Sequence, residues 1–228
     1  MSTFEATGRI AEPIRFGRWL AFAALFAAAF FALVVVTAVT INVTPTHPIE
    51  GPPFLIGSFS DVLKIFSRNF LVLTLYAMVG VAVIVLRRGA ASGDASRRER
   101  LVVKAGGAIV AAIVLGAAAR QAFVLAKMLA EFSGYLGESP IRMGLALVPH
   151  AAIELSAMFL PLGAILVERR SGEEAMRRAL AISVAIAIPL LMLAAVTEVY
   201  VSPKVMAAVT CPAAAGGAAS GPSCLSGQ

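Results

Sequence analysis

Residues 19–43 of the chain read WLAFAALFAAAFFALVVVTAVTINV, an apolar run without a charged side chain. An α-helix needs about 20 apolar residues to cross the hydrocarbon core of a bilayer, and this run has roughly 25. The apolar region of a cleaved signal peptide is shorter, at about 7 to 15 residues. The run is therefore expected to stay in the protein as a transmembrane helix.

The rest of the chain has the same apolar character. Only 14% of its 228 residues are charged and 59% are hydrophobic, whereas about 25% of the residues of a typical soluble domain are charged. This composition excludes a soluble domain and a disordered chain, and it predicts an all-α polytopic membrane protein in contact with the lipid bilayer. About five spans are expected, at residues 19–43, 69–86, 101–119 with an extension to 132, 141–167 and 179–201. They form one transmembrane domain, residues 1–203, followed by a small Gly/Ala/Pro-rich tail, residues 204–228.

The positions of the basic residues predict the orientation of these spans. Of the 19 Lys and Arg residues, 13 lie in the N-terminal arm and in the loops at residues 87–104 and 168–178. Basic residues gather in cytoplasmic loops, so the N-terminus is expected inside and the tail outside the cytoplasmic membrane of a bacterial cell. The net charge of +6 then reflects topology, and no nucleic-acid partner is expected.

Charged residues interrupt the apolar pattern at two places outside the loops. Residues 61–68 alternate apolar and charged positions in the pattern of a short helix that lies in the membrane interface before the second span. In the third span, Ala108, Ala112 and Gly116 recur every four residues, a spacing that lets a neighbouring helix approach closely. Arg120 continues roughly that face. The helix therefore either runs on to residue 132 with its charges turned inward, or breaks near Arg120 and lies on the outer surface.

The fourth span carries a histidine and a carboxylate at membrane depth. His150 and Glu154 are four residues apart, so their side chains share one helix face and can share a hydrogen bond or a proton. An ionised Asp, Lys or Arg at the membrane centre costs roughly 2.5 to 3.5 kcal/mol on insertion scales, so this pair needs a reason to be there. Three interpretations remain open: a structural pair that locks helix packing, a proton or ion site, and metal catalysis, for which the chain has too few histidines.

Three other polar residues are candidate members of this intramembrane site. Glu198 lies near the outer end of the fifth span, either in the site or as a surface residue that extends toward water. Counting about 1.5 Å per residue from the outer ends of the spans places His150 about 9 Å deeper than Glu198, so contact would require residues 141–146 to be non-helical. Asn69 and Arg120 are further candidate partners for the carboxylates. Three prolines inside spans are expected to break the helices: Pro149, Pro161 and Pro189.

Motifs for catalysis, metal binding and cofactor binding are missing from the sequence. His47 and His150 are the only histidines, so a zinc-protease helix is excluded, and the chain has neither a serine hydrolase elbow nor a glycine-rich phosphate loop. No enzymatic activity, metal site or cofactor is therefore expected. Cys211 and Cys224 of the tail form either a disulfide on the oxidising outer side, which would stabilise the tail by about 3 kcal/mol, or two unpaired thiols.

Three segments of the sequence match a known pattern in the same order along the chain. They are the phrase Pro149-His150-x-x-x-Glu154-Leu155-x-Ala157 inside a span, residues 65–69 with Gly80 eleven residues further on, and residues 198–203. Together they resemble the stage II sporulation protein M family of integral membrane proteins, over about residues 60–203. Ala151 and Ser156 stand where that family commonly has glycine and proline.

The resemblance implies a helical protein of about five spans without an established catalytic activity. The namesake of the family is similar to a scaffold that holds cell-wall hydrolases at a membrane, and some relatives are similar to accessory or immunity proteins. We therefore expect a non-enzymatic membrane scaffold or accessory subunit that organises membrane or external partner proteins. The chain is also a candidate to form a homo-oligomer. Two alternatives stay open: a permease or an ion- or proton-coupled transport subunit that uses His150 and Glu154, and an accessory subunit of a larger membrane complex.

Overall fold

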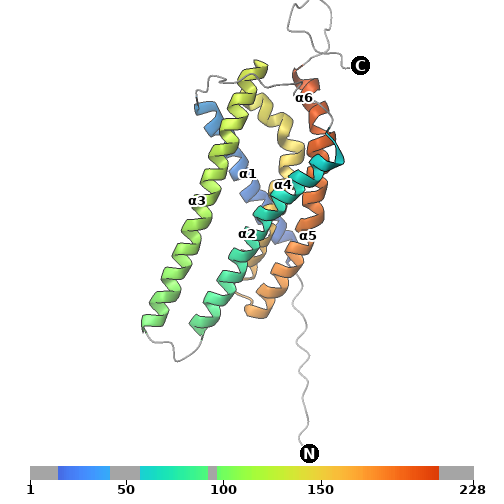
Figure 1. Cartoon of the computed structure of the whole chain (residues 1–228). Coiled ribbons are helices and arrows are strands. Elements are labelled where there is room, and N and C mark those ends of the chain that lie inside the picture. Colours follow the sequence, from blue (N-terminus) through green and yellow to red (C-terminus); the bar gives the residue numbers. More distant parts are fainter. Residues whose placement is uncertain (1–14, 42–56, 92–96, 211–228) are drawn as a thin grey trace, which may run out of the picture.

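The computed structural model describes residues 15–41, 57–91 and 97–210, and within these ranges the chain forms six α-helices and no β-strand (Figure 1). The helices are α1 (Phe16–Thr40), α2 (Phe59–Ala91), α3 (Arg97–Leu136), α4 (Pro140–Glu168), α5 (Glu173–Tyr200) and α6 (Ser202–Thr210).

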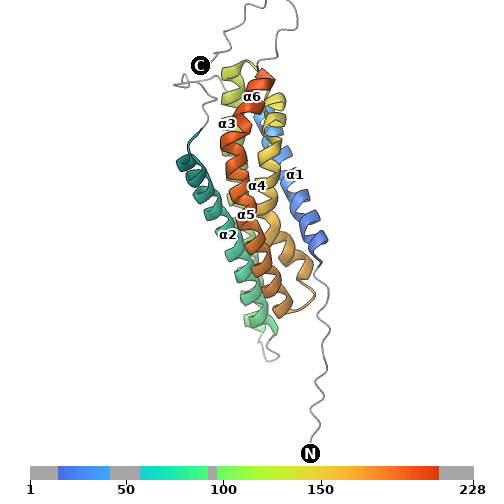
Figure 2. The ribbon, with the colours of Figure 1, turned by 90° about the vertical axis from the view of Figure 1, so that its right-hand side faces the viewer.

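Five of the described helices, α1 to α5, are long and apolar enough to cross a membrane. They run side by side with alternating directions and form an elongated bundle (Figures 1 and 2). Large apolar side chains point outward from it; Leu25 is 63% exposed and Leu71 is 75% exposed. Water would solvate this surface poorly, whereas lipid tails contact it favourably. The structure confirms the all-α polytopic membrane fold that the composition predicts.

Helix α4 lies at the centre of the bundle, between α1 and α5. Half of its apolar segment is buried, against 6% of the corresponding segment of α3. Aromatic rings join α4 to two neighbouring helices: the centroid of the Phe159 ring lies 6.1, 5.8 and 5.5 Å from those of Phe26, Phe30 and Tyr76. These separations are typical of favourable aromatic pairs. Because α4 carries His150 and Glu154, its central place brings both residues into the interior.

The contact between α1 and α4 is unusually close at one end of the bundle. A Cβ atom at Gly163 of α4 would lie 2.8 Å from the backbone oxygen of Trp19 in α1, so only glycine fits there. One turn further along α4, Glu168 Oε1 accepts a hydrogen bond of 3.0 Å from Trp19 Nε1. Both side chains are buried. A polar contact and a close backbone approach therefore join the same two helices.

Local sequence signals set the turn between α3 and α4. Gly137 has a positive φ of 69°, and Glu138 N donates to Ser133 O at 3.0 Å, the pattern that ends a helix at a glycine. Ser139 then caps α4, because its side-chain oxygen accepts from Arg142 N at 3.3 Å, and Pro140 takes the first helical position, where its missing N–H is not needed. These signals fix the residue at which α4 begins.

The expected helix breaks at Pro149, Pro161 and Pro189 are wrong, since α4 and α5 continue through all three residues. A proline removes one backbone donor and crowds the preceding turn. Inside a packed transmembrane bundle, however, neighbouring helices and local adjustments compensate for the freed carbonyl, so the helix continues.

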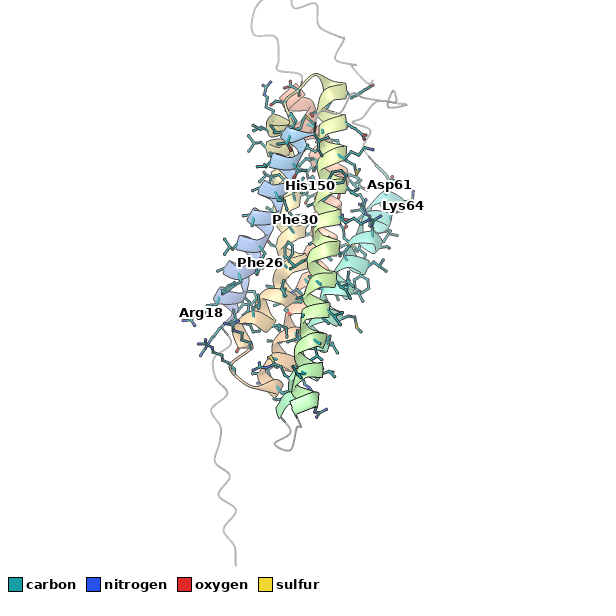
Figure 3. The ribbon with its side chains drawn as sticks, turned by 90° about the vertical axis from the view of Figure 1, so that its left-hand side faces the viewer. Arg18, Phe26, Phe30, Asp61, Lys64 and His150 are labelled. Carbon is teal, nitrogen blue, oxygen red and sulfur yellow. The ribbon has the colours of Figure 1, made fainter. Side chains whose placement is uncertain are left out.

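The expected separate interfacial helix at residues 61–68 is also wrong, because these residues form the first turns of α2. No glycine or proline separates them from the span. Val62 is fully buried and packs with Ala195 and Val199 of α5, whereas the ion pair between Lys64 Nζ and Asp61 Oδ1, at 3.0 Å, lies at the outer surface (Figure 3).

Helix α3 runs to Leu136 without a break, and its charges do not turn inward. Lys127 Nζ lies 3.6 Å from Glu131 Oε1 on the outer surface, and Arg120 is exposed. The small residues Ala108, Ala112 and Gly116 are exposed as well, so no described helix of this chain packs on them.

Helix α6 was not expected from the sequence. It follows α5 after the single residue Val201, extends the bundle at the end where α4 begins, and packs against α4 and α5 (Figures 1 and 2). Pro203 takes its second position, where a helix tolerates proline. The expected tail, residues 204–228, thus begins inside a helix; Cys211 and Cys224 lie outside the described residues.

Candidate functional site

A cavity of about 420 Å³ lies inside the bundle, and side chains from all six helices line it. Most of its wall is apolar, for example Phe30 of α1 and Leu129 of α3. Six polar or charged residues also line it: Arg68, Asn69, Gln121, His150, Glu154 and Glu198. His150 and Glu154 lie about 15 and 21 Å along α4 from its start, so this polar part of the wall lies well inside the apolar length of the bundle.

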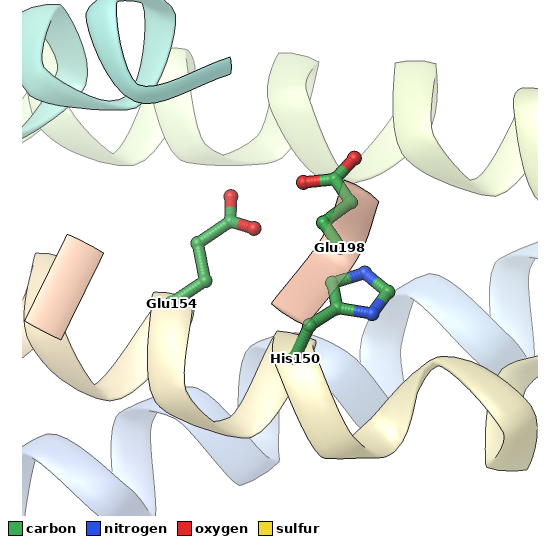
Figure 4. Close-up of side chains that lie close together, drawn as sticks. All are labelled: His150, Glu154 and Glu198. Carbon is green, nitrogen blue, oxygen red and sulfur yellow. The ribbon is translucent and has the colours of Figure 1, made fainter. Parts of the chain in front are cut away.

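Three of these side chains point toward one another. The nearest nitrogen or oxygen atoms of His150, Glu154 and Glu198 all lie within 4.8 Å of one another (Figure 4). His150 is buried, with 8% of its surface exposed, and both glutamates are partly buried. Helix α4 contributes the first two residues at the expected four-residue spacing, and α5 contributes the third.

The expected separation in depth between His150 and Glu198 is wrong. That expectation placed the end of α5 at the membrane surface. Because α6 continues beyond α5 and packs along α4, Glu198 lies at the level of His150 rather than above it. Residues 141–146 are helical, so the contact does not require a shortened α4.

The orientation of the His150 ring is set by the junction of α5 and α6. Ser202 Oγ lies 2.6 Å from His150 Nδ1, and the Ser202 hydroxyl donates to the Thr197 carbonyl oxygen at 3.3 Å. When the hydroxyl proton is used in this way, Oγ accepts from Nδ1–H, and Nε2 keeps its lone pair. Figure 4 shows the His150 ring beside the side chains of Glu154 and Glu198.

Helix α2 supplies the counter-groups of the carboxylates. The buried Asn69 side chain hydrogen-bonds Glu154, and the Arg68 guanidinium is close enough to attract both Glu154 and Glu198 electrostatically. Two ionised carboxylates and one guanidinium leave a net charge of about −1 in surroundings where an uncompensated charge is costly. The charge balance is completed by one proton or by a cation.

The cluster has the chemistry of an acceptor site. Ionised carboxylates only accept hydrogen bonds, and so does an imidazole nitrogen that carries no proton. Groups of this kind repel one another at short range unless a proton or cation lies between them. The arrangement is therefore suited to taking up a positively charged species from the cavity.

The sequence identified this site in part. His150 and Glu154, which the sequence paired, and Glu198 and Asn69, which it offered as candidate members, all line the cavity. Arg120 does not join them: it is exposed on the outside of α3, and the next residue, Gln121, lines the cavity instead.

Arg68 and Ser202 were missed, although one sequence signal pointed to each. Arg68 directly precedes Asn69, and Ser202 belongs to the closing segment, residues 198–203, that carries the family resemblance.

No family model, curated protein or solved structure matches this chain.

Proposed function

We propose that this protein is an ion- or proton-coupled membrane transport subunit, in which His150, Glu154 and Glu198 take up a proton or small cation inside the bundle. The observation that carries the proposal is the convergence of these three acceptors on one cavity at membrane depth. Ionisable residues inside a membrane are costly to insert and commonly mark ion pathways or proton relays. A pair that only locked helix packing would not need a lined cavity beside it.

The test is flux through the purified protein in liposomes. With a membrane potential imposed, an internal dye should report proton or monovalent cation entry for the wild type. Glu154→Gln should abolish the flux, because the amide keeps the shape of the side chain and removes the exchangeable charge. Glu174→Gln is the matched control, since Glu174 is an exposed carboxylate in the first turn of α5 and should not affect flux. The proposal fails if wild type and Glu154→Gln conduct equally, or if neither conducts.

A second function, that of a scaffold or accessory subunit, is supported by the outer face of α3. Arg120 lies near the middle of the apolar segment Ala105–Leu136, is exposed, and forms no ion pair among the described residues. A guanidinium that faces lipid at this depth is costly. The exposed Gly116, one turn away, would let another helix approach closely. We propose that a transmembrane helix with a carboxylate, from a partner protein, packs here, which would suit the scaffold role that the stage II sporulation protein M resemblance implies.

Photo-crosslinking in native membranes tests this second function. A photoreactive residue at position 116 should give one defined adduct with another membrane protein. Arg120→Leu should remove that adduct, whereas Arg170→Leu, which removes an exposed arginine at the end of α4, should leave it unchanged. Adducts with lipid only, or adducts that survive Arg120→Leu, count against the scaffold role.

A further inference from the structure

We propose that His150, Glu154 and Glu198 bind one divalent transition-metal ion, of the zinc or manganese type, on the side of the cavity that α2, α4 and α5 line. This inference rests on the proposed transport function, because it names the cation that the acceptor cluster takes up. It is carried by geometry, by the support of the histidine ring and by the charges around the cluster.

The geometry is close to that of a three-ligand metal site. Zinc binds histidine nitrogen and carboxylate oxygen at about 2.0–2.2 Å, so ligand atoms around one ion lie roughly 3.4 Å apart. The three side chains already place such atoms within 4.8 Å of one another. Small rotations of the two glutamate side chains, which face the open space of the cavity, would complete the site (Figure 4).

The neighbours of the cluster support the ligands in the way that metal sites require. Metal-binding histidines commonly use their second ring nitrogen in a hydrogen bond that fixes the orientation of the ring. Ser202 provides this contact, at 2.6 Å from His150 Nδ1, and leaves Nε2 for the ion. Asn69 likewise holds Glu154 through a hydrogen bond.

The donor set selects the class of ion. One imidazole and two carboxylates suit zinc, manganese or iron(II), whereas calcium and magnesium are bound by oxygen ligands. Three protein ligands leave at least one coordination position open toward the cavity. An open position is typical of sites that exchange water or substrate, and not of closed structural sites.

Arg68 gives the site a means of exchange. Without an ion, the Arg68 guanidinium attracts the two carboxylates electrostatically. A divalent ion would neutralise both carboxylates by itself, so the guanidinium would then be in excess. Binding of the ion should therefore turn Arg68 away from the cluster. Arg68 would act as a built-in competitor of the metal.

The test is a calorimetric titration of the full-length protein in detergent with Zn²⁺, after treatment with a chelator. Cys211→Ser and Cys224→Ser are included in every sample, because thiolates are strong zinc ligands. We expect one ion to bind per chain. X-ray absorption should show nitrogen and oxygen ligands at about 2.0–2.2 Å and no sulfur at about 2.3 Å.

Variants assign the binding to this cluster. Glu198→Gln should weaken zinc affinity strongly, Ser202→Ala should weaken it about tenfold, and Glu174→Gln should have no effect. Arg68→Gln should tighten binding, a gain that a damaged fold does not produce. The proposal is overturned if the wild-type protein does not bind one zinc ion per chain. It is also overturned if Glu198→Gln and Arg68→Gln both bind zinc with the affinity of the wild type.

The outcome separates this inference from the proposed function. Proton flux that depends on Glu154 in metal-free liposomes, without stoichiometric zinc binding, keeps the transport function and removes the metal site. Zinc binding that depends on Glu198, without flux of any ion, keeps the metal site and removes transport.

Discussion

Trp19 and Glu168 show how one side chain can make a buried carboxylate acceptable. Glu168 is 7% exposed, and Trp19, 2% exposed, donates its indole N–H to it at 3.0 Å. A buried polar group that loses its partner pays the full cost of its desolvation. The pair also joins the beginning of α1 to the end of α4. It is therefore both a polar contact and a link between two helices distant in sequence.

We expect Trp19→Phe to lower the free energy of unfolding by about 1–3 kcal/mol, because phenylalanine keeps much of the ring and removes the donor. Denaturation in mixed micelles measures the change. Adding Glu168→Leu should recover part of the loss, and this non-additivity identifies the pair as coupled. Tyr135→Phe, which removes a hydroxyl from an exposed ring of α3, is the control and should change little. Strictly additive effects would show that the two residues act independently.

The sequence predicted only those parts of the polar site that depend on the spacing of residues within one helix. The four-residue spacing of His150 and Glu154 places them on one face whatever the tertiary structure, so the sequence identified the pair. The approach of Glu198 depends on where α5 ends relative to α4, which hydropathy does not fix. Arg68 was overlooked because it lies in the segment that the sequence assigned to an interfacial helix. Ser202 was overlooked because it lies between the expected end of the fifth span and the expected tail.

Among the helices, α1 and α4 depend on a contact that only glycine permits. The 2.8 Å separation between a Cβ atom added to Gly163 and Trp19 O involves backbone, which a side-chain rotation cannot relieve. Gly107 of α3 is the opposite case, because a Cβ there would meet nothing within 4 Å. Substitutions at these two glycines therefore distinguish the effect of close helix packing, at Gly163, from the effect of helix propensity alone, at Gly107.

Gly163→Ala should destabilise the bundle by about 1–3 kcal/mol through overpacking, whereas Gly107→Ala should stabilise it by up to about 1 kcal/mol, since alanine is the better helix former. Thermal unfolding in the same detergent compares the two variants. Opposite signs are the expected result. A Gly163→Ala protein as stable as the wild type would mean that α1 and α4 can separate without cost.

The existence of the helices was easier to predict than their ends or their continuity. Hydropathy located all five spans, because each must supply enough apolar length for lipid. The prolines do not break their helices, because the loss of one backbone hydrogen bond is tolerated where neighbouring helices hold the segment. Helix α6 was overlooked because its nine residues are too short and too weakly apolar to resemble a span.

The molecule as a whole should sit with its basic loops in the cytoplasm. The 13 basic residues of the arm and two loops fall on one side when the spans alternate. A membrane-impermeant thiol reagent tests this in a Cys211→Ser, Cys224→Ser background. It should label Glu138→Cys in intact cells, and should label Asp94→Cys only after the membrane is opened. Labelling of Asp94→Cys in intact cells would reverse the orientation.

The cavity wall includes residues of every helix, and this has a consequence for biogenesis. During synthesis α2 is made before α4, and α5 and α6 are made last. Glu154 therefore arrives when Arg68 and Asn69 are already in place, but Glu198 and Ser202 do not yet exist there. We therefore expect α2 to supply the charge that compensates Glu154 during insertion, and the acceptor cluster to be complete only when α5 and α6 dock.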